Sequence, residues 1–299
     1  MVKPGLSILI PIYNYDVRPL VEALQQQAAR TDWPVEILCW DDASEPPFRA
    51  LNAVLGALNG VTYQLMTENM GRSRIRNRLA AAAQYDYLLF MDGDSEVARE
   101  DYLERYLSCC SPERLLYGGR IYQTEPPQAN NLQLHWHYGR QREVQMVEER
   151  QKQPYHSFMT NNFLLPRTLF EPIRFDERLL QYGHEDTLFG LELRKREIPI
   201  LHLDNPLIHA GLEPAPVFLR KSVKAIENLA FLYQEGSLRE TRLLRVYERL
   251  LKWKLIRPLG WGLRLALPVL KEYLLNTNTP NLKIFDLYKL GVLIQCLKR

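Results

Sequence analysis

An apolar run that ends in an acidic turn constrains the fold of this chain more than any other feature. Residues 87–91 read Tyr-Leu-Leu-Phe-Met, and Asp92-Gly93-Asp94 follows directly. Because the apolar side chains occupy successive positions, the run predicts a strand that is buried on both faces. Such strands belong to parallel sheets covered by helices, and ligands of these sheets bind beyond the carboxyl ends of the strands. The run therefore predicts an α/β fold with Asp92 and Asp94 at its binding edge.

The neighbouring residues alternate between short apolar segments and segments with helical spacing. Strands are predicted at residues 6–10, 35–40 and 63–66, and helices at residues 17–29, 48–58 and 73–83. This alternation indicates a mainly parallel sheet flanked by helices. Beyond Asp94 the pattern weakens. We expect a charged surface helix over residues 132–152 and a helix from Gly183 to about Arg196.

The charge of the chain is distributed unevenly. Residues 239–299 contain 13 Lys and Arg but 4 Asp and Glu, a net charge of +9, whereas the whole chain carries +3 and residues 1–238 therefore −6. A basic tail on an acidic body indicates a partner of its own, such as an anionic membrane surface or nucleic acid. We predict two domains, residues 1–236 and a basic, amphipathic helical region at residues 237–299.

Cysteine usage and the N-terminus predict a cytoplasmic protein. The 4 cysteines show neither metal-ligand spacing nor a disulfide framework, which favours a reducing compartment. The first residues lack the apolar core of a signal peptide, and no run of about 18 apolar residues would span a bilayer. We expect the protein in the cytoplasm or on the cytoplasmic face of a membrane.

Two of the predicted strands end in carboxylates. Asp41 and Asp42 follow the second strand, as Asp92 and Asp94 follow the fourth, so parallel strands place both pairs at one edge of the sheet. Like charges gathered there repel one another unless a cation or hydrogen-bond donors occupy the site. Carboxylate oxygens suit Mg²⁺ or Mn²⁺, which also binds substrate phosphates. The alternative for Asp92 and Asp94 is an ordinary polar turn, in which Gly93 allows the tight backbone.

Four arginines crowd the start of the third predicted helix, at Arg72, Arg74, Arg76 and Arg78. The N-terminus of a helix attracts anions, and arginines add charge-assisted hydrogen bonds. A bound phosphate or a salt bridge to the sheet's own acids would each compensate this charge, and the sequence leaves both alternatives open.

Two later residues are candidates for chemistry. Asp186 opens a predicted helix, where it is either a cap or a general base near a phosphate-bearing centre. His209 is either structural or a third metal ligand through its imidazole.

These residues together resemble the family 2 glycosyltransferases with the GT-A fold. The resemblance spans most of residues 5–212, and its motifs occur in the family's order. They are Pro11-Ile12-Tyr13-Asn14, Asp41-Asp42-Ala43-Ser44, Asn69-Met70-Gly71 with Arg76-Asn77, the Asp-x-Asp motif Asp92-Gly93-Asp94, Gly183-His184-Glu185-Asp186, and His209. The resemblance implies a GT-A-type sheet with a Rossmann-like nucleotide-binding half, followed by a C-terminal helical appendage.

The resemblance also implies roles for individual residues. The nucleotide-sugar-binding residues would be Pro11, Tyr13, Asn14, Asp41, Asp42, Gly71, Arg76, Asp92 and Gly93. The metal ligands, for Mn²⁺ or Mg²⁺, would be Asp94, Asp92 and His209. Asp186 would act as the catalytic base, with Glu185 near the acceptor.

The implied activity is an inverting transfer of one sugar from a nucleotide-diphosphate sugar, with uridine as the favoured nucleoside. The acceptor would be a hydroxyl of a glycan or of a lipid-linked molecule, in the biosynthesis of a surface polysaccharide, and no nucleic-acid partner is expected. The chain lacks the Gln-x-x-Arg-Trp motif of processive polymerising members. A transferase of single sugars therefore fits better than a polymerase.

Other functions remain as alternatives. A sugar nucleotidyltransferase shares the sheet and the acidic metal site, but it usually opens with a Gly-rich basic loop where this chain has Pro11 to Asn14. A dinucleotide-dependent oxidoreductase would need G-x-G-x-x-G after the first strand, which is missing. A non-catalytic nucleotide-sugar-binding module would not require Asp186.

The basic tail mixes leucine runs with Lys, Arg and Trp. Residues 250–256 have an apolar face edged by basic residues, as interfacial helices do. Pro258, Pro268 and Pro280 are expected to break the tail into short helices. Peripheral membrane contact through residues 239–299, and a helical appendage packed on the protein, are both consistent with this pattern.

Overall fold

The computed structural model describes residues 3–178 and 183–298, which divide into two compact units. Unit 1 comprises residues 1–123, 143–180 and 185–211, and unit 2 comprises residues 124–142, 181–184 and 212–299. Unit 2 thus begins well before the boundary predicted at residue 236. The physical reason is helix α9 (Ala215–Gln234), which packs against α12 (Leu282–Leu297) and so joins the C-terminal helices.

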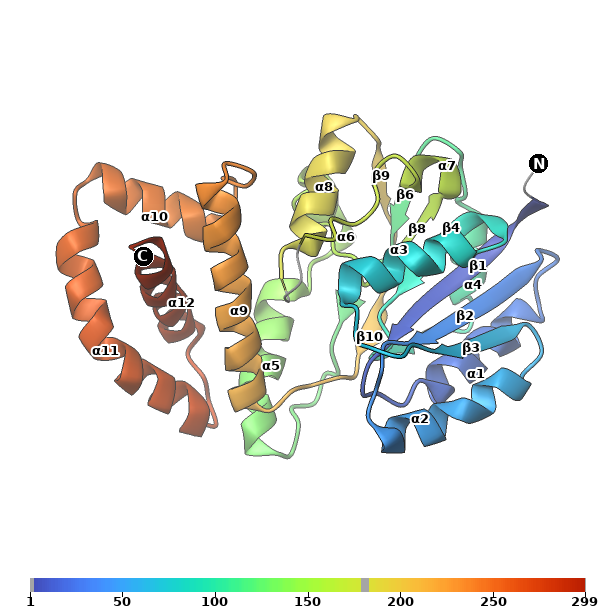
Figure 1. Cartoon of the computed structure of the whole chain (residues 1–299), viewed down its shortest axis with the longest axis horizontal. Coiled ribbons are helices and arrows are strands. Elements are labelled where there is room, and N and C mark those ends of the chain that lie inside the picture. Colours follow the sequence, from blue (N-terminus) through green and yellow to red (C-terminus); the bar gives the residue numbers. More distant parts are fainter. Residues whose placement is uncertain (1–2, 179–182, 299) are drawn as a thin grey trace. The chain divides into compact units, whose positions relative to one another are not determined.

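Unit 1 is built on a mostly parallel sheet, which has seven strands within the described residues (Figure 1). The strand order is β3 (Val61–Leu65), β2 (Val35–Asp41), β1 (Lys3–Ile12), β4 (Tyr85–Met91), β8 (Asn162–Pro166), β6 (Leu115–Tyr117) and β9 (Ile200–His202). The strands β3, β2, β1 and β4 are parallel, β8 is antiparallel to β4 and β6, and β9 is parallel to β6. The predicted α/β fold is confirmed.

Helices and turns cover both faces of this sheet. They are α1 (Arg18–Ala28), α2 (Pro46–Asn52), η1 (Ala53–Ala57), α3 (Arg72–Ala82), α4 (Tyr102–Leu107), α6 (Val147–Lys152), α7 (Arg167–Phe170) and α8 (Glu185–Lys195). Leu89 and Met91 of β4 pack in one buried cluster with α1 and α4. Leu88 and Phe90 pack in the other with α3, α7 and α8. This two-sided burial is the reason for the uninterrupted apolar run.

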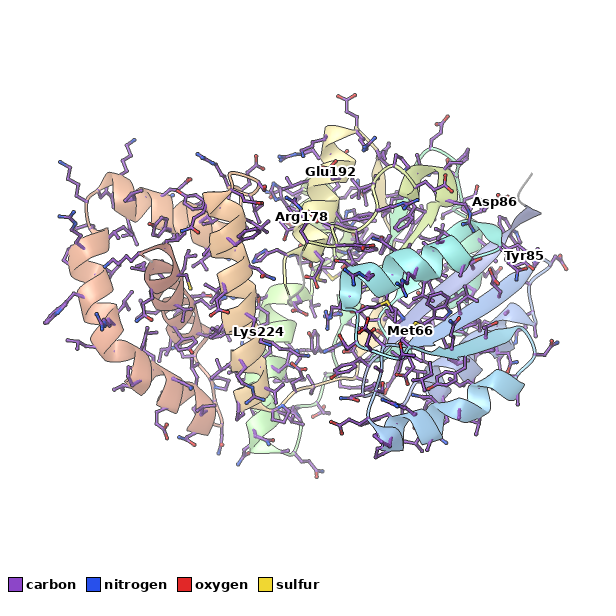
Figure 2. The ribbon with its side chains drawn as sticks, viewed as in Figure 1. Met66, Tyr85, Asp86, Arg178, Glu192 and Lys224 are labelled. Carbon is purple, nitrogen blue, oxygen red and sulfur yellow. The ribbon has the colours of Figure 1, made fainter. Side chains whose placement is uncertain are left out.

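The carboxyl ends of the parallel strands meet at one edge of the sheet. Met66, which follows β3, and Tyr85, which begins β4, lie at opposite ends of the strands in Figure 2. Because β1 to β4 run in the same direction, Asp41 at the end of β2 and Asp92 just after β4 are delivered to the same edge.

A second, small sheet joins three distant segments of unit 1. Its strand order is β5 (Ser95–Val97), β10 (Leu207–His209) and β7 (Arg120–Ile121). The strand β10 is antiparallel to β5, with His209 opposite Ser95, and it is parallel to β7, with Leu207 opposite Arg120. Strands of two or three residues carry no measurable periodicity, so the sequence did not predict this sheet.

Unit 2 is helical. Its elements are η2 (Asn130–Leu132), α5 (Gln133–Tyr138), η3 (Gly139–Glu143, whose last residue belongs to unit 1), α9, α10 (Arg242–Lys252), α11 (Ile256–Asn276) and α12. None of the helices in the described part of the chain is long and apolar enough to cross a bilayer.

The single surface helix predicted over residues 132–152 is wrong. The segment instead contains α5, η3 and α6, and Met146, whose backbone is extended, lies between η3 and α6. Its two ends pack in different environments. Tyr138 contacts Phe218 and Phe285 inside unit 2, whereas Arg150 on α6 is buried in unit 1 and donates to the carbonyl oxygen of Leu203 over 2.9 Å.

The predicted helix breaks at Pro258 and Pro268 are also wrong, since α11 continues through both residues. Pro258 lies in the first turn, where a backbone N–H has no partner within the helix. Pro268 lies inside α11, which curves along its length in Figure 1. Of the three prolines, only Pro280 lies between two helices, α11 and α12.

Candidate active site

The first carboxylate of the Asp-Gly-Asp turn is held by two arginines. Oδ1 of Asp92 accepts a 2.6 Å hydrogen bond from Nη2 of Arg76, and Oδ2 accepts one of 3.0 Å from Nη2 of Arg120. Arg76 extends from α3 and is buried. For this arginine, the alternative of a salt bridge to the sheet's own acid is therefore confirmed.

Arg120 continues this chain of charges to a second acid. Its Nη1 donates to Oε2 of Glu143 over 3.2 Å, and the hydroxyl of Tyr122 donates to the same oxygen. Ion pairs largely removed from water are costly unless the remaining donors and acceptors are satisfied. Here hydrogen bonds join all five side chains, although the buried Nε of Arg76 has no hydrogen-bond partner within the described residues. We call Arg76, Asp92, Arg120, Glu143 and Tyr122 the Arg120 network.

A buried amide fixes the backbone that carries Arg120. Oδ1 of Asn162 accepts hydrogen bonds from the hydroxyls of Tyr102 and Tyr106, each over 2.7 Å. Its Nδ2 donates to the carbonyl oxygen of Gly119 over 2.9 Å. Because Gly119 directly precedes Arg120, these hydrogen bonds fix the backbone from which the Arg120 side chain extends.

The second carboxylate of the turn, Asp94, lies beside His209. Nδ1 of His209 is 3.5 Å from Oδ1 of Asp94, and the imidazole is buried. The pairing of β10 with β5 produces this contact, and the amide of Ala210 donates to the Asp94 carbonyl oxygen over 2.9 Å. Burial alone would raise the pKa of Asp94, but the nearby charges of His209 and Arg120 hold it well below its ordinary value.

A glycine leaves room for the Asp94 carboxylate. A Cβ atom added at Gly211 would lie 2.6 Å from Cβ and 2.8 Å from Oδ2 of Asp94. Both distances are too short for non-bonded atoms, so any larger residue at position 211 would displace the Asp94 side chain.

Asp94 and His209 suit two ligand positions of a divalent cation. Within the described residues, the buried Oδ1 of Asp94 accepts no hydrogen bond shorter than its 3.5 Å approach to His209. Mg²⁺ and Mn²⁺ commonly take only one or two protein ligands when phosphate oxygens and water complete the shell. Imidazole nitrogen is a poor ligand for the harder Mg²⁺, so this pair favours Mn²⁺.

Asp92 does not join this pair as a third ligand in the structure. Both of its oxygens are engaged by Arg76 and Arg120. In residues 3–178 and 183–298, no three His, Cys, Asp or Glu side chains are grouped so that they could hold an ion. The set of Asp92, Asp94 and His209 therefore stays a prediction, of which the structure places Asp94 and His209 side by side.

The first turn of α8 carries the acid that the sequence singled out as a base. Burial raises the pKa of Asp186 to about 6, and the charges of Glu185 and Glu143 contribute to the increase. The amide of Thr187 donates to Oδ1 of Asp186 over 2.8 Å, and this hydrogen bond offsets part of the increase in pKa. A carboxylate that titrates near pH 6 is ionised at neutral pH and can accept a proton.

Several residues expected at the nucleoside lie at the ends of β1 and β2 and in the loops that follow these strands. Asp41 is fully buried, and it accepts hydrogen bonds from the amide of Ser44 over 2.7 Å and from the hydroxyl of Tyr63 over 2.8 Å. The amide of Asn14 donates to Oγ of Ser44 over 2.8 Å, and Tyr13 beside it is exposed. Asp41 thus supports the loop, and Tyr13 is accessible to a ligand.

Asp42 connects the loop after β2 to the start of α3. Its carboxylate accepts hydrogen bonds from the amides of Met70 and Gly71, over 2.8 and 3.1 Å, and burial raises its pKa. Gly93 lies close to Pro11, since a Cβ at position 93 would be 3.0 Å from the Pro11 carbonyl oxygen. Glycine is therefore needed at position 93 for packing, beyond any approach of a ligand.

The model of glycosyl transferase family 2 matches residues 7–173, which is more than half of the chain. The chain belongs to this family. The predicted resemblance is thereby confirmed, together with glycosyltransferase as the class of enzyme. The curated "Putative glycosyltransferase EpsH" of Bacillus subtilis (strain 168) is 22% identical over 266 residues, which cover 81% of this chain and 73% of that protein.

Solved glycosyltransferases share the fold of this family 2 member. The mannosyltransferase PcManGT from Pyrobaculum calidifontis, in complex with GDP-Man and Mn²⁺, is 14% identical, with a TM-score of 0.56. The alignment covers 99% of this chain and 86% of that one. TarS residues 1–349 from S. aureus are 18% identical, with a TM-score of 0.50 and coverage of 95% and 89%. These likenesses support the GT-A-type fold.

The structure of this glycosyltransferase adds site residues that the sequence did not reveal. Arg120, Tyr122 and Glu143 belong to the short strand β7, its continuation and η3. The one available signal was the pair Gly118-Gly119 before Arg120, which marks a close approach of the backbone. Indeed, a Cβ at Gly119 would lie 2.8 Å from the guanidinium carbon of Arg150.

Proposed function

We propose that this family 2 glycosyltransferase moves a single sugar from a nucleotide-diphosphate sugar to a hydroxyl group of a glycan or lipid-linked acceptor, with inversion of configuration. The observation that carries the proposal is the raised pKa of Asp186, about 6. Part of the increase comes from Glu143, a member of the Arg120 network, which also holds the Asp92 carboxylate at the edge of the sheet. We therefore assign the proton acceptor and the Asp-Gly-Asp turn to one site.

Asp94 and His209 would hold a divalent cation, Mn²⁺ in preference to Mg²⁺. When bound, such an ion supplies positive charge for the diphosphate leaving group. The side chains around it have complementary tasks. Arg76 and Arg120 orient Asp92 toward the donor and place two further positive charges near the phosphates, where arginine forms strong charge-assisted hydrogen bonds.

Asp186 would act as the general base, with Glu185 near the acceptor. As the acceptor oxygen forms its bond to the anomeric carbon, its proton passes to the Asp186 carboxylate. The bond from the anomeric carbon to the diphosphate oxygen breaks on the opposite face, and the electron pair leaves with the nucleoside diphosphate. One displacement inverts the configuration and needs no covalent intermediate on the enzyme.

The donor nucleoside is proposed to be uridine, on the basis of the family resemblance. PcManGT, whose fold is similar, was solved with GDP-Man. The pocket would be lined by Pro11, Tyr13, Asn14, Asp42, Gly71 and Gly93, with Asp41 supporting its loop. UDP-sugars and GDP-sugars are therefore the two groups of donors to compare. Transfer of one sugar at a time is proposed because the chain lacks the processive Gln-x-x-Arg-Trp motif. Surface-polysaccharide biosynthesis is the proposed setting, on the basis of the family resemblance.

The test measures donor binding and sugar release separately. Wild type is incubated with each nucleotide sugar and Mn²⁺, and free nucleoside diphosphate is measured, while calorimetry gives donor affinity. Asp186→Asn should keep donor affinity and lose about 10²–10⁴-fold in turnover, the usual contribution of a general base. Asp94→Ala should lose the Mn²⁺-dependent part of donor affinity. Glu192→Gln, on the same helix as Asp186 (Figure 2), is the matched control and should change neither quantity.

Full turnover in Asp186→Asn would show that Asp186 is not the general base. Release of pyrophosphate from a nucleoside triphosphate and a sugar phosphate would identify a nucleotidyltransferase instead. Donor binding with no release of nucleoside diphosphate, in the presence of lipid and glycan acceptors, would indicate a binding module.

A further inference from the structure

The outer side of α11 carries large apolar side chains exposed to solvent. Trp261 is 70% exposed, Leu265 61% and Val269 71%, and Trp253 between α10 and α11 is 60% exposed. Residues 261, 265 and 269 recur every four positions, so they form one stripe along the helix. We call Trp253, Trp261, Leu265 and Val269 the apolar stripe.

The opposite side of α11 is already packed. Leu263 is buried, and a Cβ at Gly260 would lie 2.9 Å from Cγ2 of Ile294 on α12. A Cβ at Gly291 of α12 would in turn lie 3.0 Å from Leu267 of α11. In Figure 1, α10 and α11 curve around α12. The core of unit 2 therefore uses the inner face, and the apolar stripe contributes nothing to it.

Basic residues border the apolar stripe. Arg257, Arg264 and Lys271 recur every seven residues on α11, which places all three along one side of the stripe, and each is exposed. The exposed face of α10 is basic too, with Arg242, Arg245, Arg249 and Lys252 at spacings of three and four. The acid Glu272, three positions after Val269, is also exposed on α11, but residues 239–299 carry 13 Lys and Arg against 4 Asp and Glu, so this surface is positive overall and complementary to a negative one.

We propose that the outer face of α10 and α11 binds the surface of an anionic phospholipid bilayer. The apolar stripe inserts between the headgroups, and the basic residues on its border contact lipid phosphates. Tryptophan is favoured at this depth because its ring is apolar while its N–H stays hydrated. A helix with one apolar face and a basic border lies in the plane of the membrane. The inference is independent of the sugar-transfer activity, since it uses none of the site residues.

The charge pattern favours lipid over the other candidate occupants. A nucleic acid would be attracted by the arginines, and its bases could stack on a tryptophan ring, but it would leave Leu265 and Val269 exposed to water. A second copy of this chain would bring the same positive charge against itself, which costs free energy in an interface that buries the stripe.

The test is flotation of the full-length protein with vesicles. We expect binding to vesicles of phosphatidylcholine with 30% phosphatidylglycerol, at low salt, and little binding to phosphatidylcholine alone. The triple variant Trp261→Gln, Leu265→Gln, Val269→Gln should reduce partitioning more than a hundredfold, given the free energy of burying three such side chains. The triple variant Arg257→Gln, Arg264→Gln, Lys271→Gln should reduce it about a hundredfold and weaken its dependence on salt.

Matched controls come from unit 1. The control for charge is a triple variant that removes three positive charges from exposed ion pairs, Arg30→Gln, Lys152→Gln, Lys195→Gln. The control for apolar surface is Val54→Gln, which replaces a residue that is 57% exposed. Both controls should bind vesicles as wild type does. All variant positions are exposed, so thermal unfolding should confirm that each protein is folded.

Two outcomes would overturn the proposal. One is wild-type protein that does not float with anionic vesicles, or an apolar-stripe variant that floats equally well. The other is a wild-type dimer in analytical ultracentrifugation that the apolar-stripe variant dissociates, because a second copy would then cover this face.

Discussion

The Arg120 network and the outer face of α10 and α11 both concentrate charge, but they differ in burial and in how the charge is compensated. In the network, two arginines and two acids alternate, and the hydrogen bonds that join them are 2.6–3.2 Å long. On the helical face, basic residues point to solvent beside exposed tryptophans. The first arrangement is compensated mostly within the chain, whereas the second is open to water and, in our proposal, to a membrane surface.

The difference has a consequence for mutations. Removing one member of a buried network leaves another charge without its partner, so the free energy of unfolding should fall sharply. Removing an exposed side chain leaves nothing buried and unpaired, so the stability of the chain should hardly change. Stability and binding measurements on the two regions therefore test this comparison directly.

The largest effect is expected at the centre of the network. Arg120→Met should lower the free energy of unfolding by about 3–5 kcal/mol, because the largely buried carboxylates of Asp92 and Glu143 would each lose a charged hydrogen-bond donor. Chemical denaturation gives the value. Arg18→Met is the control, since it breaks a half-exposed pair with Asp16 and should cost no more than about 1 kcal/mol. A loss below 1 kcal/mol in Arg120→Met would mean that the network is not a buried unit.

A smaller effect is expected beside Asp94. Gly211→Ala adds a methyl carbon that would lie 2.6 Å from Cβ of Asp94. The Asp94 carboxylate must therefore shift, and Mn²⁺ affinity should fall about tenfold or more. Binding of Mn²⁺ is measured by calorimetry with the donor present. Gly236→Ala is a comparison for the loss of a glycine, since no atom lies within 4 Å of its added Cβ. Its positive φ of 78° costs stability, but it should leave Mn²⁺ affinity unchanged. Equal Mn²⁺ affinity in Gly211→Ala and wild type would show that Asp94 does not bind the ion.

The pH dependence sharpens the same comparison. With a pKa of about 6, Asp186 should lose its proton-accepting form as the pH falls, and turnover at pH 5 should be about a tenth of that at pH 7.5.

The folded pKa lies above the ordinary 3.8, so the contribution of Asp186 to stability is fully present below about pH 3.8 and is lost as the pH rises through 6. Asp186→Asn should therefore unfold at a higher temperature than wild type at pH 7.5, with an inverse relation between stability and activity.

Equal thermal stability of Asp186→Asn and wild type at pH 7.5 would contradict the burial of that charge. A turnover profile that is flat between pH 5 and 7.5 would contradict its role as base.

The smallest effect on stability is expected on the helical face. Trp261→Gln should change the free energy of unfolding by less than about 0.5 kcal/mol, although it removes the largest exposed side chain of α11. Denaturation in the absence of vesicles measures this. A loss above 2 kcal/mol would show that the side chain packs within the chain after all.

Much of this fold could be predicted from the sequence, for identifiable reasons. The residues of β4 are apolar on both faces because α1 and α4 cover one face and α3, α7 and α8 the other. That pattern is local, and so are Asp92 and Asp94 at its end. The single helix expected over residues 132–152 failed because its composition did not show that Tyr138 and Arg150 pack in different units.

The sequence by itself determined the mainly parallel sheet, the edge at which its acids lie, the family and the basic, amphipathic character of α10 and α11. Each of these follows from a pattern within one short segment. Only the tertiary structure decided that His209 lies beside Asp94 and that Arg120 joins Asp92 to Glu143. These contacts depend on the register of β5, β10 and β7, strands too short to carry a pattern, which become defined only when residues about a hundred positions apart in the chain pair with one another.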